Sequence, residues 1–116
     1  MLSTFRRNRR TAERLRVPVP VRLETSQGPV VGKTTNISLG GALVEVELGA
    51  TEVARIPERT TMDIIVDEDQ LSFDILVSRR DGHTVAVEFV RIRSGEDYRK
   101  LRLFLESHLS NLTADH

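Results

Sequence analysis

Apolar residues recur at every second position near the start of the chain, and this alternation constrains the fold more than any other feature. Val17, Val19, Val21 and Leu23 carry it first. It is typical of a strand with one buried face, because successive side chains of a strand point to opposite faces of a sheet. Five further segments are predicted strands: 30–37, 42–46, 62–66, 71–77 and 84–92.

Turn-forming residues separate these segments. Gln27-Gly28-Pro29 ends the first strand, and the acidic step Glu68-Asp69 suits a hairpin between the fourth and fifth. Asp81-Gly82 is a stronger hairpin signal, and we expect these two residues at the centre of a type I′ turn, where both positions need a positive φ. The sequence therefore predicts a meandering arrangement of short strands.

Two parts of this pattern are less regular. Pro18 and Pro20 lie on the second face of the first strand, and proline cannot donate to a ladder, so we expect that strand to lie at an edge or to pair on one side only. The segment from Glu47 to Thr61 contains Gly49 and Pro57 and has no clean period. We interpret it as a loop with a short helical turn around 51–55.

The spacing changes to three or four residues at the end of the chain. The apolar positions are Tyr98, Leu101, Leu105, Leu109 and Leu112, with Phe104 beside them. They predict an amphipathic helix of about four turns over residues 94–112. Ser94 is the expected N-cap, and Asp97 occupies the capping-box position. Six strands and one helix predict an all-β barrel or sandwich whose open side the helix covers.

The 116 residues suffice for one hydrophobic core, so we expect a single domain: an arm (1–16), a barrel (17–93) and the helix (94–112). Cysteine is absent, which excludes disulfides, thiolate metal sites and thiol nucleophiles. No apolar stretch approaches the length of a membrane span, so we expect a cytoplasmic protein with no membrane insertion.

The histidines and the acidic residues do not form a recognisable metal or catalytic site. His83, His108 and His116 have no metal-ligand spacing, and Asp67-Glu68-Asp69 lacks the glycine and distal acid of a calcium loop. No triad, acid–base pair or phosphate loop is evident, so we expect neither an enzyme nor a metal or cofactor.

Charge is balanced overall, with 17 basic and 17 acidic residues, but it is unevenly distributed. The arm carries six arginines against the single acid Glu13: Arg6, Arg7, Arg9, Arg10, Arg14 and Arg16. A guanidinium group is planar, donates a fork of two hydrogen bonds and stacks on aromatic rings. The arm therefore favours an anionic, ring-containing ligand over a merely electrostatic role.

The turn Asn36-Ile37-Ser38-Leu39-Gly40-Gly41 is the second candidate. Short Asn and Ser side chains project polar atoms from a tight bend, and the glycine pair permits positive φ and close approach of a ligand. Such a turn can hold a phosphate or the edge of a base. It can equally be a simple corner between two strands, in which Asn36 and Ser38 bond only the backbone.

The combination resembles the PilZ family of bacterial cyclic di-GMP receptors. The similarity lies in an Arg-x-x-x-Arg arm, a Val-Pro-Val strand and Asn-x-Ser-x-x-Gly-Ala opening a third strand, and extends to Val85-Ala86-Val87-Glu88-Phe89. It implies a six-stranded antiparallel barrel with a C-terminal helix. It also implies cyclic di-GMP as ligand, with arginines stacking on guanine or neutralising phosphate, Asn36 and Ser38 bonding a guanine edge or phosphate, and Gly41 keeping the floor clear.

The arm departs from the family's register, in which the second arginine directly precedes the first strand and the first lies four residues earlier. Arg16 fills that second place, but Ala12 stands at its partner position. Arg10 and Arg14 have the right mutual spacing two residues early, and Arg6 with Arg10 repeats it further out. We favour Arg10 and Arg14, with Arg6, Arg9, Arg16 and Gly40 as less certain members of the site.

Three functions follow from these features. The first is a receptor whose arm orders over the nucleotide and changes a surface read by a protein of motility, polysaccharide export or transcription. The second is an adaptor of the same fold that has lost the ligand. The third is a nucleic-acid binder that uses the basic arm; because most aromatic residues are assigned to the core, stacking on exposed bases, and hence this function, is disfavoured.

Overall fold

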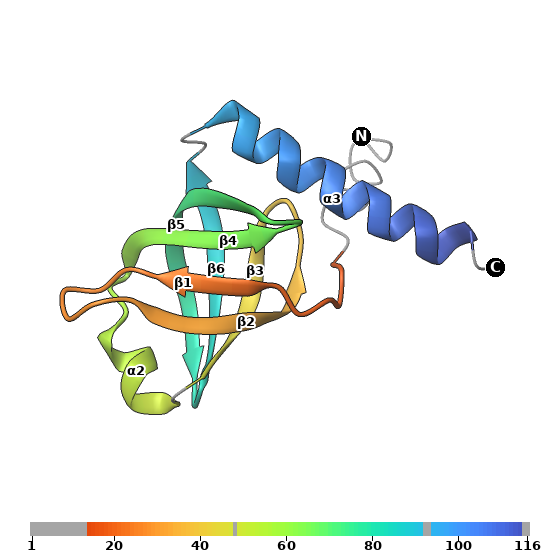
Figure 1. The fold of residues 1–116 in the computed structure, drawn as a ribbon. Helices are drawn as coiled ribbons and strands as arrows, with labels where there is room; N and C mark the ends of the chain where they lie inside the picture. Colours follow the sequence, from red (N-terminus) through yellow and green to blue (C-terminus); the bar gives the residue numbers. More distant parts are fainter. Residues whose placement is uncertain (1–13, 48, 92–93, 115–116) are drawn as a thin grey trace, which may run out of the picture.

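The computed structural model describes residues 14–47, 49–91 and 94–114 of the chain. They form six strands and two helices: β1 (Pro20–Leu23), β2 (Val30–Ile37), β3 (Gly41–Val46), α2 (Ala50–Arg55), β4 (Arg59–Val66), β5 (Asp69–Asp81), β6 (Thr84–Arg91) and α3 (Gly95–Ala114). The strands close into an antiparallel barrel in the order β1-β2-β3-β6-β5-β4 (Figure 1). The predicted fold, a six-stranded antiparallel barrel with a C-terminal helix, is confirmed.

The alternation in the sequence fills the barrel. From Leu71 to Val77, every second side chain of β5 is buried and the intervening ones are half-buried. The Phe73 ring stacks on Phe89, with 4.8 Å between the ring centroids. Burial of these side chains contributes roughly 1.5–3 kcal/mol each, which makes the core the main source of stability.

The expectation of an edge position for the first strand is wrong. β1 pairs with β2 on one side and with β4 on the other, which closes the barrel. The strand tolerates Pro20 because proline is its first residue, and pairing with β4 begins only at Val21. The paired residues of β1 and β4 are about 40 positions apart in the sequence. A local sequence pattern does not reveal such a pairing.

The two hairpin turns differ from the predicted ones. The β4–β5 turn is formed by Asp67 and Glu68, whose φ angles are 47° and 72°, one position before the predicted step. In the β5–β6 hairpin Asp81 pairs with Thr84, so the turn residues are Gly82 and His83. Of this pair only Gly82 has a positive φ, 59°. This is the pattern of a type II′ turn, and the predicted type I′ turn is wrong.

The irregular segment after β3 contains the predicted helical turn as α2. Val53 and the following Ile56 are buried against the barrel, and the Arg80 guanidinium donates to the Val53 carbonyl at 2.6 Å. β4 begins at Arg59, so the last three residues of the predicted loop are strand, paired with residues 74–76 of β5. Pairing with a long neighbouring strand here outweighs the weak local signal.

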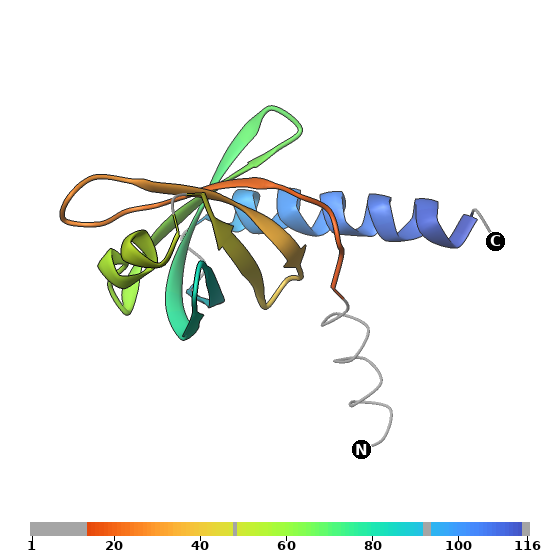
Figure 2. The same ribbon diagram turned by 90° about the horizontal axis from the view of Figure 1, so that it is seen from below.

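Helix α3 lies across the end of the barrel opposite α2 (Figure 1). Leu101, Phe104 and Leu105 are buried, as predicted. In both views the carboxyl-terminal part of the helix extends past the strands (Figures 1 and 2). The helix therefore covers one end of a closed barrel instead of an open side. No helix among the described residues is long and apolar enough to span a membrane.

The start of α3 confirms the predicted N-cap. The Ser94 hydroxyl accepts a hydrogen bond from the Asp97 amide at 3.2 Å. The Asp97 carboxylate, which a capping box would direct back to Ser94, instead accepts the Ser72 amide of β5 at 3.0 Å. This contact ties the first turn of the helix to the barrel wall.

Candidate ligand-binding cleft

The turn between β2 and β3 is held by its own serine. The Ser38 amide donates to the Gly41 carbonyl at 2.9 Å, and the hydroxyl donates to the same carbonyl at 3.4 Å while accepting the Gly40 amide at 3.2 Å. Ser38 is only 4% exposed. The hydroxyl therefore shapes the turn, as in the simple corner considered above.

The glycines of this turn serve packing, not an unusual backbone conformation. Neither Gly40 nor Gly41 has a positive φ, so the turn does not use the conformational freedom that the glycine pair permits. A Cβ at Gly41 would collide with the Val87 carbonyl of β6, whereas one at Gly40 would have only the Ser38 hydroxyl within 4 Å. Gly41 is thus required for the close approach of β3 to β6.

The segment before β1 is bound to the end of β2. Leu15 and Ile37 exchange two backbone hydrogen bonds, of 2.8 and 3.0 Å, and Leu15 is buried. Three positions before Ile37 on β2, the buried Thr34 hydroxyl accepts the Val19 amide at 3.0 Å and donates to the Val17 carbonyl at 2.8 Å. These bonds place the leader segment, residues 14–19, beside the turn.

Arg14 and Asn36 meet as a consequence. The Arg14 Nη1 donates to the Asn36 Oδ1 at 2.6 Å. Asn36 reaches the outer surface because the β2–β3 register shifts between Thr34 and Asn36, so that Thr35 and Asn36 both face outward before Ile37 returns inward. A β-bulge of this kind re-aims a side chain. The contact joins the two candidate motifs.

A cleft of about 530 Å³ opens next to this contact on the outside of the barrel. Its lining residues are Arg14, Asn36, Ser38, Gly40, Gly41, Ala42, Leu43, Ser78, Arg79, Ala86, Val87 and Glu88. The cleft thus brings together every predicted site residue that the structure describes except Arg16, which is exposed outside the lining. Arg6, Arg9 and Arg10 lie outside the described residues.

The opposite wall of the cleft contains residues that sequence reasoning missed. Arg79 of β5 and Glu88 of β6 are exposed there. The β5–β6 register shifts between Val77 and Arg79, so that Ser78 and Arg79 both face outward opposite Ala86. The break in alternation after Val77 was a signal of this second bulge. The bulge places the cation Arg79 in the cleft, which Arg14 of the leader segment lines as well.

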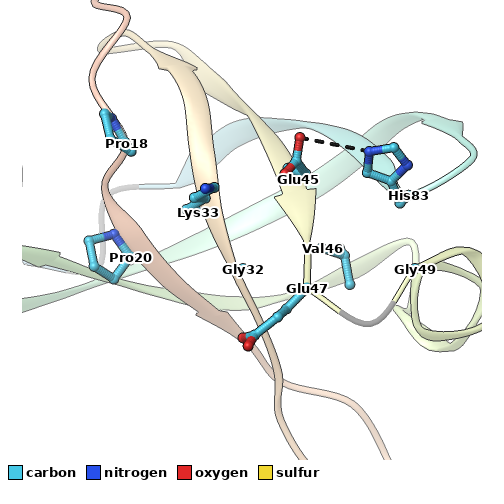
Figure 3. Close-up of a pocket in the computed structure, with 9 residues that line it drawn as sticks. All are labelled: Pro18, Pro20, Gly32, Lys33, Glu45, Val46, Glu47, Gly49 and His83. Atoms are coloured by element: carbon cyan, nitrogen blue, oxygen red, sulfur yellow. Dashed lines mark ion pairs between the residues drawn. The ribbon is translucent and has the colours of Figure 1, made fainter.

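A larger hollow of about 680 Å³ lies over β1, β2 and β3 (Figure 3). Its charged residues are Lys33, Glu45 and Glu47, and the His83 Nε2 lies 3.7 Å from a carboxylate oxygen of Glu45. Figure 3 shows Glu47 pointing away from that pair. Two carboxylates against one lysine disfavour an anionic ligand, because like charges repel. The smaller cleft is the better anion site.

The arrangement in the smaller cleft is suited to binding a ligand. Two guanidinium groups, one amide and one carboxylate surround a surface of mostly small residues, a combination suited to a flat anionic ligand. Among the described residues no cluster of His, Asp and Glu has the geometry to hold a metal ion. The His108 ring, which is not part of the cleft lining, contacts Phe104, and its Nδ1 lies 3.0 Å from the Phe104 carbonyl.

A family model described as the PilZ domain matches residues 8–107. It spans the leader segment, the barrel and most of α3. A search of proteins with curated functions gives no match.

Several solved structures share the fold. The PilZ domain of CeSA from a cellulose-synthesizing bacterium is 20% identical, with a TM-score of 0.61 over 84% of this chain and 99% of that chain. An uncharacterized Legionella protein, Lpg0364, is 16% identical, with a TM-score of 0.58 over 87% and 98%. The inhibitor of motility MotI/DgrA of Bacillus subtilis is 18% identical, with a TM-score of 0.63 over 84% of this chain and 49% of that chain.

Proposed function

The chain belongs to the PilZ domain family, and from this membership we propose that it is a receptor for cyclic di-GMP. PilZ domains are binding and adaptor modules, generally receptors of this nucleotide. The ligand would occupy the cleft between Arg14 and Arg79. In this proposal the chain works as one domain and, as is typical of PilZ proteins, in the cytoplasm.

The single observation that carries the proposal is the 2.6 Å contact between Arg14 and Asn36. It brings a guanidinium of the leader segment to the turn with the Asn-x-Ser-x-x-Gly spacing. A guanidinium there can fork to a phosphate, or stack on a guanine, while Asn36 bonds an edge of the base. Ser38 and Gly41 would contribute by fixing the shape of the turn.

Ligand binding would act on the leader segment. The Arg14 side chain is exposed, and among the described residues its one side-chain partner is Asn36. Replacing this hydrogen bond by one to a phosphate of the ligand therefore costs little. The arginines before Arg14, Arg10 first among them, would then close over the ligand. Such ordering offers a downstream protein a changed surface.

Calorimetric titration of the protein with cyclic di-GMP tests the proposal. We expect micromolar binding or better, about −8 kcal/mol. Arg14→Ala should weaken it about 10- to 100-fold, because a hydrogen bond to a charged group contributes roughly 1.5–3 kcal/mol. Lys33→Ala is the matched control: it removes an exposed cation from the larger hollow and should leave the affinity unchanged.

The contrary result is equally specific. If the wild-type protein gives no heat and no shift in its unfolding midpoint at millimolar nucleotide, the receptor proposal fails. An adaptor that binds proteins without the nucleotide would then be the remaining function. If Lys33→Ala weakens binding as much as Arg14→Ala, the ligand is not held in the cleft between Arg14 and Arg79.

A further inference from the structure

Glu88 is an unexpected residue in a cleft for an anion. Its side chain is exposed and lines the cleft, and none of the ion pairs between described residues includes it. A carboxylate only accepts hydrogen bonds, and it repels phosphate. A ligand that places donors against Glu88 would turn this repulsion into a specific contact.

The ladder fixes the position of Glu88 relative to the turn. Glu88 is the register partner of Gly41, which has no side chain to separate the carboxylate from the turn. On the same strand, Ala86 is the partner of both Leu43 and Arg79. Across the cleft the order is therefore Arg14 and Asn36, then Glu88, then Arg79, with only small side chains between the last two.

Few groups of a cyclic dinucleotide can satisfy a carboxylate at this place, and each ribose 2′-hydroxyl donates only a single hydrogen bond. The phosphates are acceptors, and so are the O6 and N7 atoms of guanine. The Watson–Crick edge of guanine presents two parallel donors, the N1 hydrogen and the N2 amino group, which match the two oxygens of a carboxylate. Adenine presents an acceptor, N1, beside its amino group and cannot make this paired contact.

We propose that Glu88 is the residue that selects guanine, by accepting both hydrogen bonds from the Watson–Crick edge of a base lying across Gly41. This inference rests on the proposed function and adds its base specificity. Arg79 offsets the charge of Glu88, so that two guanidinium groups face one carboxylate and the cleft still favours an anion. Glu88 thus contributes discrimination, and the arginines contribute affinity.

The test compares two nucleotides on three proteins by calorimetry, with cyclic di-GMP and cyclic di-AMP as probes. The wild-type protein should prefer cyclic di-GMP at least about 100-fold, because a site with unpaired acceptors rejects a ligand that lacks the donors. Glu88→Gln should lower the affinity for cyclic di-GMP about 10-fold or more. It should raise the affinity for cyclic di-AMP, since an amide pairs well with adenine. Glu88→Ala should lose affinity for cyclic di-GMP without that gain.

Glu58→Gln is the matched control, because it removes one exposed carboxylate just before β4, outside the cleft lining. It should leave both affinities unchanged. Equal preference of the wild-type protein for the two nucleotides, or an unchanged preference in Glu88→Gln, would overturn the inference and leave the receptor proposal standing. Failure of the wild-type protein to bind cyclic di-GMP at all would overturn both.

Discussion

Gly40 and Gly41 stand side by side in the sequence, yet the barrel makes very different demands on them. Gly41 lies where β3 approaches β6 so closely that any side chain meets the Val87 carbonyl. Gly40 is exposed, and an added Cβ would have only the Ser38 hydroxyl, at 3.9 Å, as a neighbour. The packing of β3 against β6 therefore requires glycine at position 41, whether or not a ligand binds there.

Gly41→Ala should destabilise the protein by about 1–3 kcal/mol, the cost of inserting a methyl group into packed surroundings. Gly40→Ala should be neutral or slightly stabilising, because the unfolded chain loses freedom while the folded state gains no clash. Urea denaturation of both variants measures the difference. Equal stability of the two variants would show that the strands can separate locally at no cost.

Residues of the site divide into those that a sequence reveals and those that it hides. Asn36, Ser38 and Arg14 were predicted because they lie in short, contiguous motifs. Arg79 and Glu88 join them only through strand pairing, 38 or more positions away from the turn, so no local pattern links them to it. The sequence showed that the glycine pair permits a positive φ, whereas the structure requires Gly41 for the close packing of β3 against β6.

At the scale of elements, α3 is held to the barrel by polar contacts at its first turn as well as by apolar burial. Asp97 accepts the Ser72 amide at 3.0 Å, and its own amide is capped by Ser94. Lys100 adds ion pairs of 3.7 Å to Asp69 and to Glu96. The exposed ion pairs contribute little, and the half-buried Asp97 contact contributes more.

Asp97→Ala should therefore lower the free energy of unfolding by about 1–2 kcal/mol, because the Ser72 amide loses its partner in a half-buried place. The neighbouring Glu96→Ala removes only an exposed pair with Lys100 and should cost about 0.3–0.5 kcal/mol. Chemical denaturation followed by circular dichroism measures both. A smaller loss for Asp97→Ala than for Glu96→Ala would contradict this account of helix docking.

Elements were predictable to the extent that their periods were regular. The bounds of β2, and the existence of the terminal helix with its Ser94 cap, follow from local patterns. β1 was misjudged because its second partner, β4, comes from far along the chain, and the start of β4 was missed because pairing with β5 rather than its own sequence makes it a strand. Of the two bulges beside the cleft, the one in β2 was likewise hidden, whereas the one after Val77 left a break in the alternation.

The described strands form a closed barrel, and the proposed ligand site lies on its outer wall. The leader segment is the part of the site that no strand of the barrel provides, although it joins β2 through Leu15. A ligand held between the leader segment and the wall would bind the folded state and not the unfolded chain. Binding should therefore stabilise the fold by mass action.

Cyclic di-GMP at 100 times its dissociation constant should raise the free energy of unfolding by about 2.7 kcal/mol. Thermal denaturation with increasing nucleotide measures this, and Arg14→Ala should require correspondingly more nucleotide for the same shift.

The affinity for cyclic di-GMP should fall only modestly as the salt concentration rises, since the ligand carries two phosphates. A nucleic-acid binder neutralising 6–10 phosphates would lose roughly 10³–10⁵ in affinity between about 50 and 200 mM salt.

The ring of hydrogen bonds around the barrel has one more consequence. Because each of the six described strands has a neighbour on both sides, the barrel offers no backbone template to which an incoming chain could add a strand. Closure of the barrel therefore prevents another chain from adding a strand to the sheet, and it prevents aggregation through paired sheet edges. Any protein that responds to this one must recognise its side chains or the segments outside the ring, where single substitutions can retune the match without disturbing the scaffold.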